Sequence, residues 1–211
     1  MKYLFILSFF MFTACTSTEP EQASEVNVPQ DAFDIRPLLI GESLPDVSLT
    51  GIDGNQTSIA GLVADKPSMI VFYRGGWCPF CSSHLGELAA IEEEIYELGY
   101  QILAISPDQP EYLRQSLEEQ ELSYTLLSDS SMETARAFGV AFRVDDQTVA
   151  GLKENGMDIV ERSGHQHQQL PVPAVFITDT SGQVLFQYVN PEYRERISGE
   201  VLIAALRTFK E

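Results

Sequence analysis

Two cysteines stand at the junction of a predicted strand and a predicted helix, and this junction constrains the fold more than any other feature of the chain. Residues 68–73 form a continuous apolar run, as expected for a central strand buried on both faces. Apolar residues then recur at helical spacing over residues 79–98. Cys78 therefore lies at a helix start, where free N–H groups and the positive end of the helix dipole stabilise a thiolate.

Cys81 lies one helical turn after Cys78, and this spacing predicts a redox pair. Pro79 suits the first turn because no N–H is needed there. We expect a lowered pKa for Cys78, which attacks, and a buried, ordinary thiol at Cys81, close enough to release a bound partner. A purely structural disulfide is the weaker interpretation, since so short a loop constrains the unfolded chain little.

A zinc site is another alternative, and it needs four ligands. His84 follows Cys81 closely, and His165 and His167 supply a second pair, so a ligand set is conceivable. We expect His84 on the helix surface instead, and the other two histidines in a solvated loop. The sequence thus predicts no metal, and no cofactor beyond the Cys78–Cys81 disulfide.

The remaining patterns predict an α/β fold in which the first strands are parallel and the last two form an antiparallel hairpin. Residues 140–170 have weak periodicity and are expected to form an irregular insertion. The expected elements are a hairpin around the turn 51–55, strands at 101–105, 124–127, 174–178 and 183–189, and helices at 110–117, at 130–139 with a capping box over 130–133, and after Ser198.

A second motif precedes the strand at residues 174–178. Pro173 stands directly before this apolar run, and a cis proline there would turn the chain sharply. Val172 would then present free backbone groups to a substrate beside Cys78. Two ordinary prolines entering an edge strand are the alternative.

The first residues look like a targeting segment. Lys2 precedes an apolar run of about ten residues, which is too short for the ~20 residues that span a bilayer. The run ends at Cys15 in a sequence that resembles the lipobox of bacterial lipoproteins. We predict a signal peptide over 1–14, lipid on Cys15, a flexible acidic tether over 15–36, and one domain over 37–211. An incidental cysteine near an ordinary cleavage site is the alternative.

Charge limits the partners. Thirty-one acidic against 13 basic residues give a formal net charge of −18, which excludes a binder of nucleic-acid phosphates. The same charge opposes electrostatic docking on anionic lipid, so membrane contact is expected through the N-terminal lipid alone. The domain would face the periplasm or the exterior of a bacterial envelope.

Six segments carry a resemblance to a known family, at residues 72–81, 104–108, 127–129, 135–139, 170–179 and 190–194. Over residues 40–209 the chain resembles the thioredoxin superfamily, and more narrowly the peroxiredoxin-like branch of the alkyl hydroperoxide reductase/thiol-specific antioxidant (AhpC/TSA) family. This resemblance implies a thioredoxin-like mixed sheet flanked by helices, with an N-terminal β-hairpin extension and an insertion before the cis-proline strand. It also implies Cys78 as the attacking thiol, Cys81 as the resolving thiol and Pro173 as the cis-proline.

The sequence departs from the family at two positions. Gly75 stands where typical peroxiredoxins have a threonine that binds the peroxide oxygens, and Pro173-Ala174 stands where they have an arginine. Arg74 or Arg143 would have to supply the positive charge. Because a peroxide site lacks these two donors, the Cys78–Cys81 pair better suits exchange with a protein disulfide.

The sequence therefore predicts an envelope thiol–disulfide oxidoreductase with antioxidant character, which an external thiol reductant resets. One alternative is a thiol peroxidase in which Cys78 becomes a sulfenic acid that Cys81 condenses with. Another is a non-catalytic lipoprotein that binds a partner or a metal. Substrate contacts are assigned to Trp77, Pro79, Val172 and Pro173, and support of the thiolate to Arg74 and Gly75.

Overall fold

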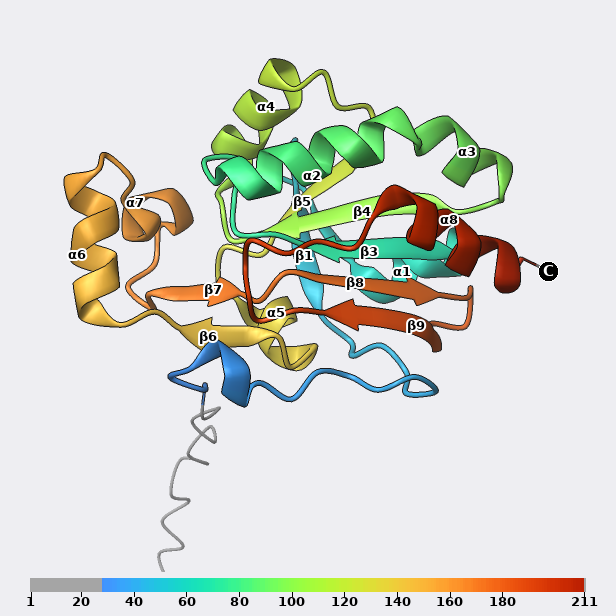
Figure 1. Cartoon of the computed structure of the whole chain (residues 1–211), viewed down its shortest axis with the longest axis horizontal. Coiled ribbons are helices and arrows are strands. Elements are labelled where there is room, and N and C mark those ends of the chain that lie inside the picture. The colour runs from blue at the N-terminus through green and yellow to red at the C-terminus, as the bar shows by residue number, and fades with distance from the viewer. Residues whose placement is uncertain (1–27, 211) are drawn as a thin grey trace, which may run out of the picture.

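The computed structural model describes residues 28–210, and its centre is a seven-stranded mixed sheet in the order β2-β1-β5-β4-β3-β8-β9 (Figure 1). β3 pairs in parallel with β4, and β4 with β5, whereas β8 and β9 form the antiparallel hairpin that the sequence predicts. The strands are β1 (Ser48–Gly51), β2 (Gln56–Ser58), β3 (Ser68–Phe72), β4 (Gln101–Ser106), β5 (Thr125–Ser128), β8 (Ala174–Thr178) and β9 (Val184–Val189).

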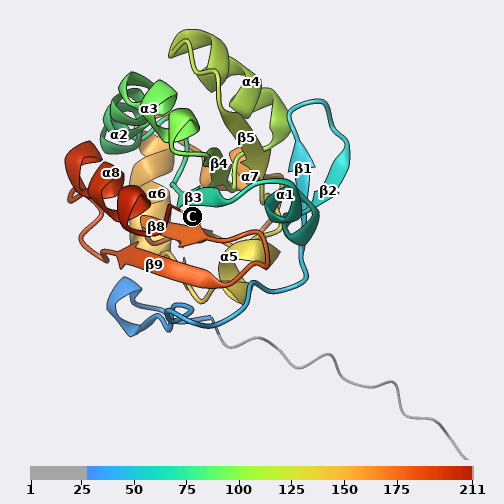
Figure 2. The same ribbon diagram turned by 90° about the vertical axis from the view of Figure 1, so that its right-hand side faces the viewer.

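Two helical layers cover the sheet because side chains of the central strand alternate between its faces. Met69 and Val71 of β3 belong to the core beneath α2, α3, α4 and α8, while Ile70 and Phe72 pack toward α1 and α5. Figure 2 shows α2, α3 and α8 on one side of the sheet and α1 and α5 on the other. These helices are α1 (Ile59–Asp65), α2 (Pro79–Ala90), α3 (Glu92–Glu97), α4 (Pro110–Glu119), α5 (Glu133–Ala137) and α8 (Gly199–Thr208).

Two helix predictions were wrong in detail. The helix expected over 79–98 is divided at the β-branched Ile91, whose backbone leaves the helical region (φ −113°, ψ 6°). The capping box expected over 130–133 does not form. Instead, the carboxylate of Asp129 accepts hydrogen bonds from the N–H groups of Thr134 (3.0 Å) and Ala135 (2.8 Å), and so satisfies the first turn of α5.

The segment 140–170 is not irregular, contrary to the prediction. It contains β6 (Ala141–Arg143), α6 (Asp146–Glu154), α7 (Ile159–Ser163) and β7 (Gln169–Pro171), and β6 pairs with β7 in a separate two-stranded sheet. Each helix is only a few turns long, but each has a side-chain cap. Asp145 accepts from Thr148 N (2.9 Å), and Asp158 from Val160 N (3.0 Å). These caps stabilise helices whose apolar periodicity alone is weak.

The prediction of a cis proline at Pro173 was wrong, since the described residues contain no cis peptide bond. Val172 also lacks the free N–H expected of it, because that group donates to the carbonyl of Val140 (2.8 Å). Pro173 is buried, and its carbonyl accepts from Asn190 N (3.2 Å). Backbone pairing on both sides therefore fixes this segment without a cis bond.

The predicted signal peptide and Cys15 lie outside the described residues, but part of the predicted tether lies within them. Residues 28–36 run along the domain, where Ile35 is buried and Arg143 N donates to the carbonyl of Pro29 (2.8 Å). A short 3-10 helix at Ala32–Asp34 is capped by the side chain of Asp31. The packed part of the chain thus begins before residue 37, the boundary that composition predicts.

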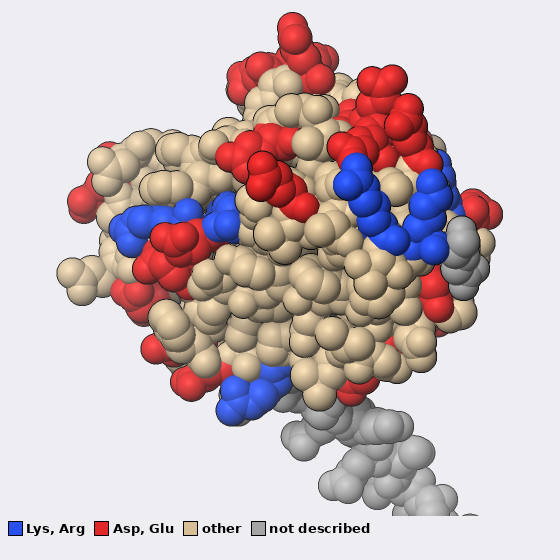
Figure 3. Space-filling view, turned by 45° about the vertical axis from the view of Figure 1, so that its right-hand side comes forward, with Lys and Arg blue, Asp and Glu red and all other residues tan. Residues whose placement is uncertain are grey.

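Charged side chains gather in separate patches on the face shown in Figure 3, where acidic groups predominate. This distribution accords with the net charge of −18. Among residues 28–210, no helix has the length and apolar character required to span a bilayer.

Gly139 provides a test of how the N-terminal segment is held. Its φ is +69°, and an added Cβ would lie 1.8 Å from the carbonyl oxygen of Arg36. We expect Gly139→Ala to lower the free energy of unfolding in urea by at least about 3 kcal/mol, because strain and a backbone clash combine.

Gly156→Ala is the matched control, since Gly156 has a similar φ of +80° but open space around the Cβ position. It should lose only the conformational strain, about 1–2 kcal/mol. Equal losses in the two variants would show that the contact with Arg36 contributes nothing.

Candidate active site

The carboxyl end of β3 leads directly into the first turn of α2 and places both cysteines at that helix end. Cys78 is the N-cap residue and Pro79 the first helical residue, as the sequence predicts. The carbonyl of Cys78 accepts from the N–H groups of Cys81 (2.9 Å) and Ser82 (3.0 Å). Cys78 is only 2% exposed and Cys81 is fully buried, and both are free thiols.

The two sulfurs share one proton unequally, and Cys78 is the more acidic of the two thiols. The thiol of Cys81 donates to the sulfur of Cys78, and this bond, with the backbone N–H of Cys81 and the charges of Arg74 and Arg196, lowers the pKa of Cys78 to about 6 despite burial. The same shared bond, together with burial, raises the pKa of Cys81. The predicted order of acidity is therefore reproduced, although the thiol of Cys81 contributes more to it than the helix end.

Two arginines stand beside the pair. Arg74 lies with its guanidinium 4.4 Å from the ring centroid of Tyr193 and 5.2 Å from that of Trp77. Arg196, which follows β9 and precedes α8, donates from Nη2 to the sulfur of Cys81 (3.5 Å). Sequence reasoning named Arg74 but missed Arg196, because Arg196 is 115 residues from Cys81 and no local pattern connects them.

Arg143, the other arginine considered from the sequence, is engaged elsewhere. Its Nη2 pairs with Asp146 (2.7 Å) and donates to the side chain of Gln168 (2.6 Å). Of the two candidates for the missing positive charge, Arg74 is the one whose field lowers the pKa of Cys78.

Gly75 explains one of the departures from the family pattern. Its φ is +140°, and an added Cβ would lie 2.1 Å from Nε1 of Trp77 and 2.8 Å from a carboxylate oxygen of Asp108. A threonine at this position would displace the indole. A side chain at position 75 would therefore compete with Trp77 for the same space.

A buried ion pair ties the insertion to the loop after β4, next to this site. Arg162 of α7 contacts both carboxylate oxygens of Asp108, with Nε–Oδ1 at 2.9 Å and Nη2–Oδ2 at 2.6 Å. Burial raises the pKa of Asp108, and the charge of Arg162 opposes that shift. Sequence reasoning assigned neither residue a role, since they lie 54 positions apart.

The three histidines have different surroundings, and His84 does not lie where the sequence predicts. His84 is buried rather than on the helix surface, and burial together with Arg196 lowers its pKa to about 4. His167 is tied to the carbonyl of Ser130 (2.9 Å), while His165 is exposed, as expected of a loop. Within residues 28–210, no cluster of histidine, cysteine and acidic side chains could hold a metal ion.

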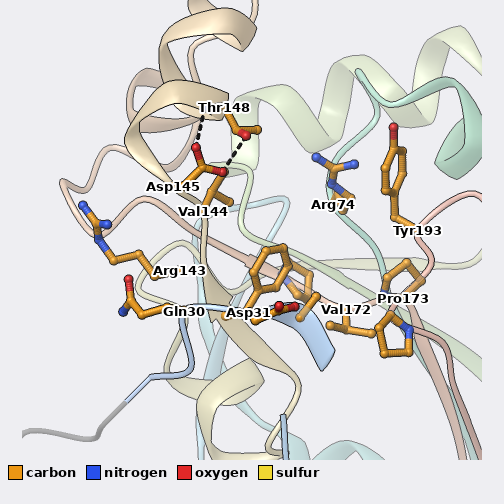
Figure 4. Close-up of a pocket in the computed structure, with 14 residues that line it drawn as sticks. Gln30, Asp31, Arg74, Arg143, Val144, Asp145, Thr148, Val172, Pro173 and Tyr193 are labelled. Atoms are coloured by element: carbon orange, nitrogen blue, oxygen red, sulfur yellow. Dashed lines mark hydrogen bonds between the residues drawn. The ribbon is translucent and has the colours of Figure 1, made fainter. Parts of the chain in front are cut away.

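A cavity of about 350 Å³ opens beside Arg74 (Figure 4). Of the residues assigned to substrate contacts, Val172 and Pro173 line it, whereas Trp77 packs against the insertion and Pro79 is exposed outside it. Figure 4 shows Arg74 and Tyr193 side by side at one end. The other walls come from the N-terminal segment and the insertion, at Gln30, Asp31, Ala32, Phe142, Arg143, Val144, Asp145, Thr148, Pro171 and Pro191.

Comparison with known proteins agrees with this geometry. Residues 40–187 match the model of the AhpC/TSA family. The chain belongs to this family. It is 31% identical over 106 residues to peroxiredoxin Bcp of Escherichia coli K12, an alignment that covers 50% of this chain and 67% of that protein. The Bcp protein of Haemophilus influenzae is 34% identical over the same length and is covered to 68%.

Solved structures show the same fold. Peroxidoxin BcpB of Mycobacterium tuberculosis superimposes with a TM-score of 0.64 at 20% identity, covering 82% of this chain and 98% of that one. Prx3 of Vibrio vulnificus in complex with hydrogen peroxide gives 0.65 at 19% identity, covering 80% and 99%. The expectation of a thioredoxin-like, peroxiredoxin-type protein is confirmed. The AhpC/TSA protein described here is a thiol-dependent oxidoreductase, and the family uses cysteine redox chemistry without a cofactor.

The pH dependence of alkylation tests the acidity of Cys78. We expect the rate with a small thiol reagent to be halved near pH 6 and to fall further below it, because only the thiolate reacts. Cys81→Ser removes the thiol donor, although its hydroxyl can still donate, and Cys81→Ala removes the donor entirely. The midpoint should therefore rise most in Cys81→Ala. A wild-type midpoint near that of free cysteine, about 8.5, would contradict the assignment.

Proposed function

We propose that this protein is a thiol peroxidase that reduces hydroperoxides at Cys78. The observation that carries the proposal is the position of Cys78, a side chain only 2% exposed at the N-terminal end of α2, where the thiol of Cys81 and the charge of Arg74 lower its pKa. Burial of this degree favours a small substrate such as a peroxide, whereas a disulfide on a folded protein requires an accessible thiol. The AhpC/TSA relatives, named as peroxiredoxins, support the same reaction.

The first step is attack of the Cys78 thiolate on the terminal oxygen of the hydroperoxide. The S–O bond forms, the O–O bond breaks, and the leaving alkoxide takes up a proton to become an alcohol, or water when the substrate is hydrogen peroxide. Cys78 is thereby oxidised to a sulfenic acid. Arg74 supplies positive charge near the developing oxyanion, in place of the arginine that the family carries before the strand.

The second step joins the two cysteines. Cys81 attacks the sulfur of the sulfenic acid, the S–O bond breaks, and hydroxide leaves with the thiol proton as water. The resulting Cys78–Cys81 disulfide is then reduced by an external thiol donor, which supplies two electrons.

Exchange with protein disulfides is the second candidate, and one observation favours it. Phe80, between the two cysteines, is 40% exposed and packs its edge against Tyr193, with ring centroids 5.8 Å apart. An exposed aromatic side chain next to a C-x-x-C pair offers an apolar contact for a partner protein. In this scheme Phe80 contacts the external thiol donor. Thiol–disulfide exchange with that donor then reduces the Cys78–Cys81 disulfide and completes the peroxidase cycle.

Cysteine variants separate the two steps. Cys78→Ser should abolish peroxide consumption, because the attacking sulfur is gone. Cys81→Ser should still consume about one equivalent of peroxide per protein and then stop as a sulfenic acid, detectable by mass spectrometry. Stopped-flow measurement of peroxide reduction by the wild type is the direct assay. A rate no higher than that of a free thiol would overturn the peroxidase and leave exchange as the primary activity.

We also propose that the protein is a lipoprotein of a bacterial envelope, on the basis of the apolar N-terminal run and Cys15. In a bacterial host, the full chain should fractionate with membranes and carry acyl groups on an N-terminal Cys15. Cys15→Ala should fail to acquire lipid and should leave the membrane fraction. A wild-type protein that retains Met1 and stays in the cytosolic fraction would contradict this proposal.

A further inference from the structure

The sulfur of Cys81 lies in a site built for a negative charge, although its resting state is a neutral thiol. The side chain is fully buried, and Nη2 of Arg196 donates to the sulfur at 3.5 Å. The guanidinium is held in place by backbone carbonyls, since its Nη1 donates to Tyr193 and to Glu195, the latter at 2.8 Å. A fixed cation of this kind requires no reorganisation when the sulfur ionises.

Two titratable neighbours of Cys81, Tyr73 and His84, are uncharged at neutral pH, and the Cys78 thiolate is the negative charge that acts on it. Burial raises the pKa of Tyr73, the residue that follows β3, so its phenol stays protonated. His84 of α2 is neutral because burial and Arg196 lower its pKa to about 4. The backbone N–H of Arg74 also stabilises an anionic Cys81. Arg196 is therefore the cation in direct contact with this sulfur.

Oxidation of Cys78 removes the negative charge that Cys81 faces at rest. In the reduced protein the Cys81 proton is held by the Cys78 thiolate. Once Cys78 is a sulfenic acid, this acceptor is gone, yet Cys81 has to become a thiolate to attack. Burial alone would disfavour that ionisation.

We propose that Arg196 is a catalytic group for the disulfide-forming step, in which it holds the Cys81 thiolate while that sulfur attacks the sulfenic acid of Cys78. The inference rests on the proposed peroxidase function. The S–S bond forms, the S–O bond of the sulfenic acid breaks, and the proton from Cys81 leaves with the hydroxide as water. The two arginines then contribute to different steps. Arg74 serves the oxidation of Cys78, to which Arg196 adds a smaller effect, and Arg196 serves its resolution.

Arg196→Met tests this division, because methionine retains much of the apolar stem and removes the cation. Stopped-flow fluorescence of Trp77, the only tryptophan, should report two phases. The first depends on peroxide concentration, and the second does not. We expect the second phase to slow about tenfold or more, and the first to change much less. Slower resolution should also increase oxidation of Cys78 to the sulfinic acid at high peroxide.

Arg196→Lys should recover part of the second-phase rate, since it keeps the charge but loses the forked geometry. Arg207→Met is the matched control. Arg207 lies in α8 and pairs at the surface with Glu94, so this variant should leave both phases unchanged. If both phases of Arg196→Met slow equally while the melting temperature falls, the role is structural and the proposal is overturned.

A second measurement does not depend on peroxide. In the Cys78→Ser background, ultraviolet absorbance of the thiolate titrates Cys81, and adding Arg196→Met should move its midpoint to higher pH. An unchanged midpoint, or an unchanged second phase in a wild type that shows a fast first phase, overturns the role of Arg196. Absence of a fast first phase in the wild type would instead overturn the peroxidase function.

Discussion

The shared proton between Cys78 and Cys81 is the interaction on which the site depends. A thiolate 2% exposed is unfavourable unless nearby donors replace the water it has lost. The thiol and the backbone N–H of Cys81 supply such donors at the first turn of α2. This arrangement makes Cys78 the more acidic thiol and keeps Cys81 protonated. Because both residues are cysteines, the difference in their acidity comes from their surroundings.

The wall around the pair is assembled from distant parts of the chain. Trp77 occupies the space that Gly75 leaves open, and it packs against the insertion, whose helix α7 is joined to the loop after β4 through Arg162 and Asp108. Arg74 lies over the rings of both Trp77 and Tyr193 and so joins them. The ion pair of Arg162 and Asp108 holds α7 against the loop after β4. Removing either partner would leave the other charge unpaired and release that contact. The two cysteines thus lie on a fold shared with the AhpC/TSA family, and side-chain contacts formed by this chain surround them.

Local sequence patterns predicted most of the regular structure because the central strands are long apolar runs and the main helices have apolar faces. They failed where stability comes from single side chains. α1, seven residues long, starts from a hydrogen bond between Ser58 and Gly61 N, and α5 starts from Asp129, which lies before the expected cap. Caps of this kind satisfy a few N–H groups and leave little periodic signal. The insertion was missed for the same reason.

By itself the sequence determined that a strand would deliver Cys78 to a helix start and that Cys81 would follow one turn later, because both depend on neighbours within a few residues. Tertiary structure alone decided which cation reaches which sulfur. Arg196 arrives from the segment before α8, His84 turns inward, and Pro173 stays trans within a paired backbone. These outcomes depend on contacts between segments far apart in the chain, and hydrogen-bond and charge partners at such separations leave no periodic pattern that could be recognised beforehand.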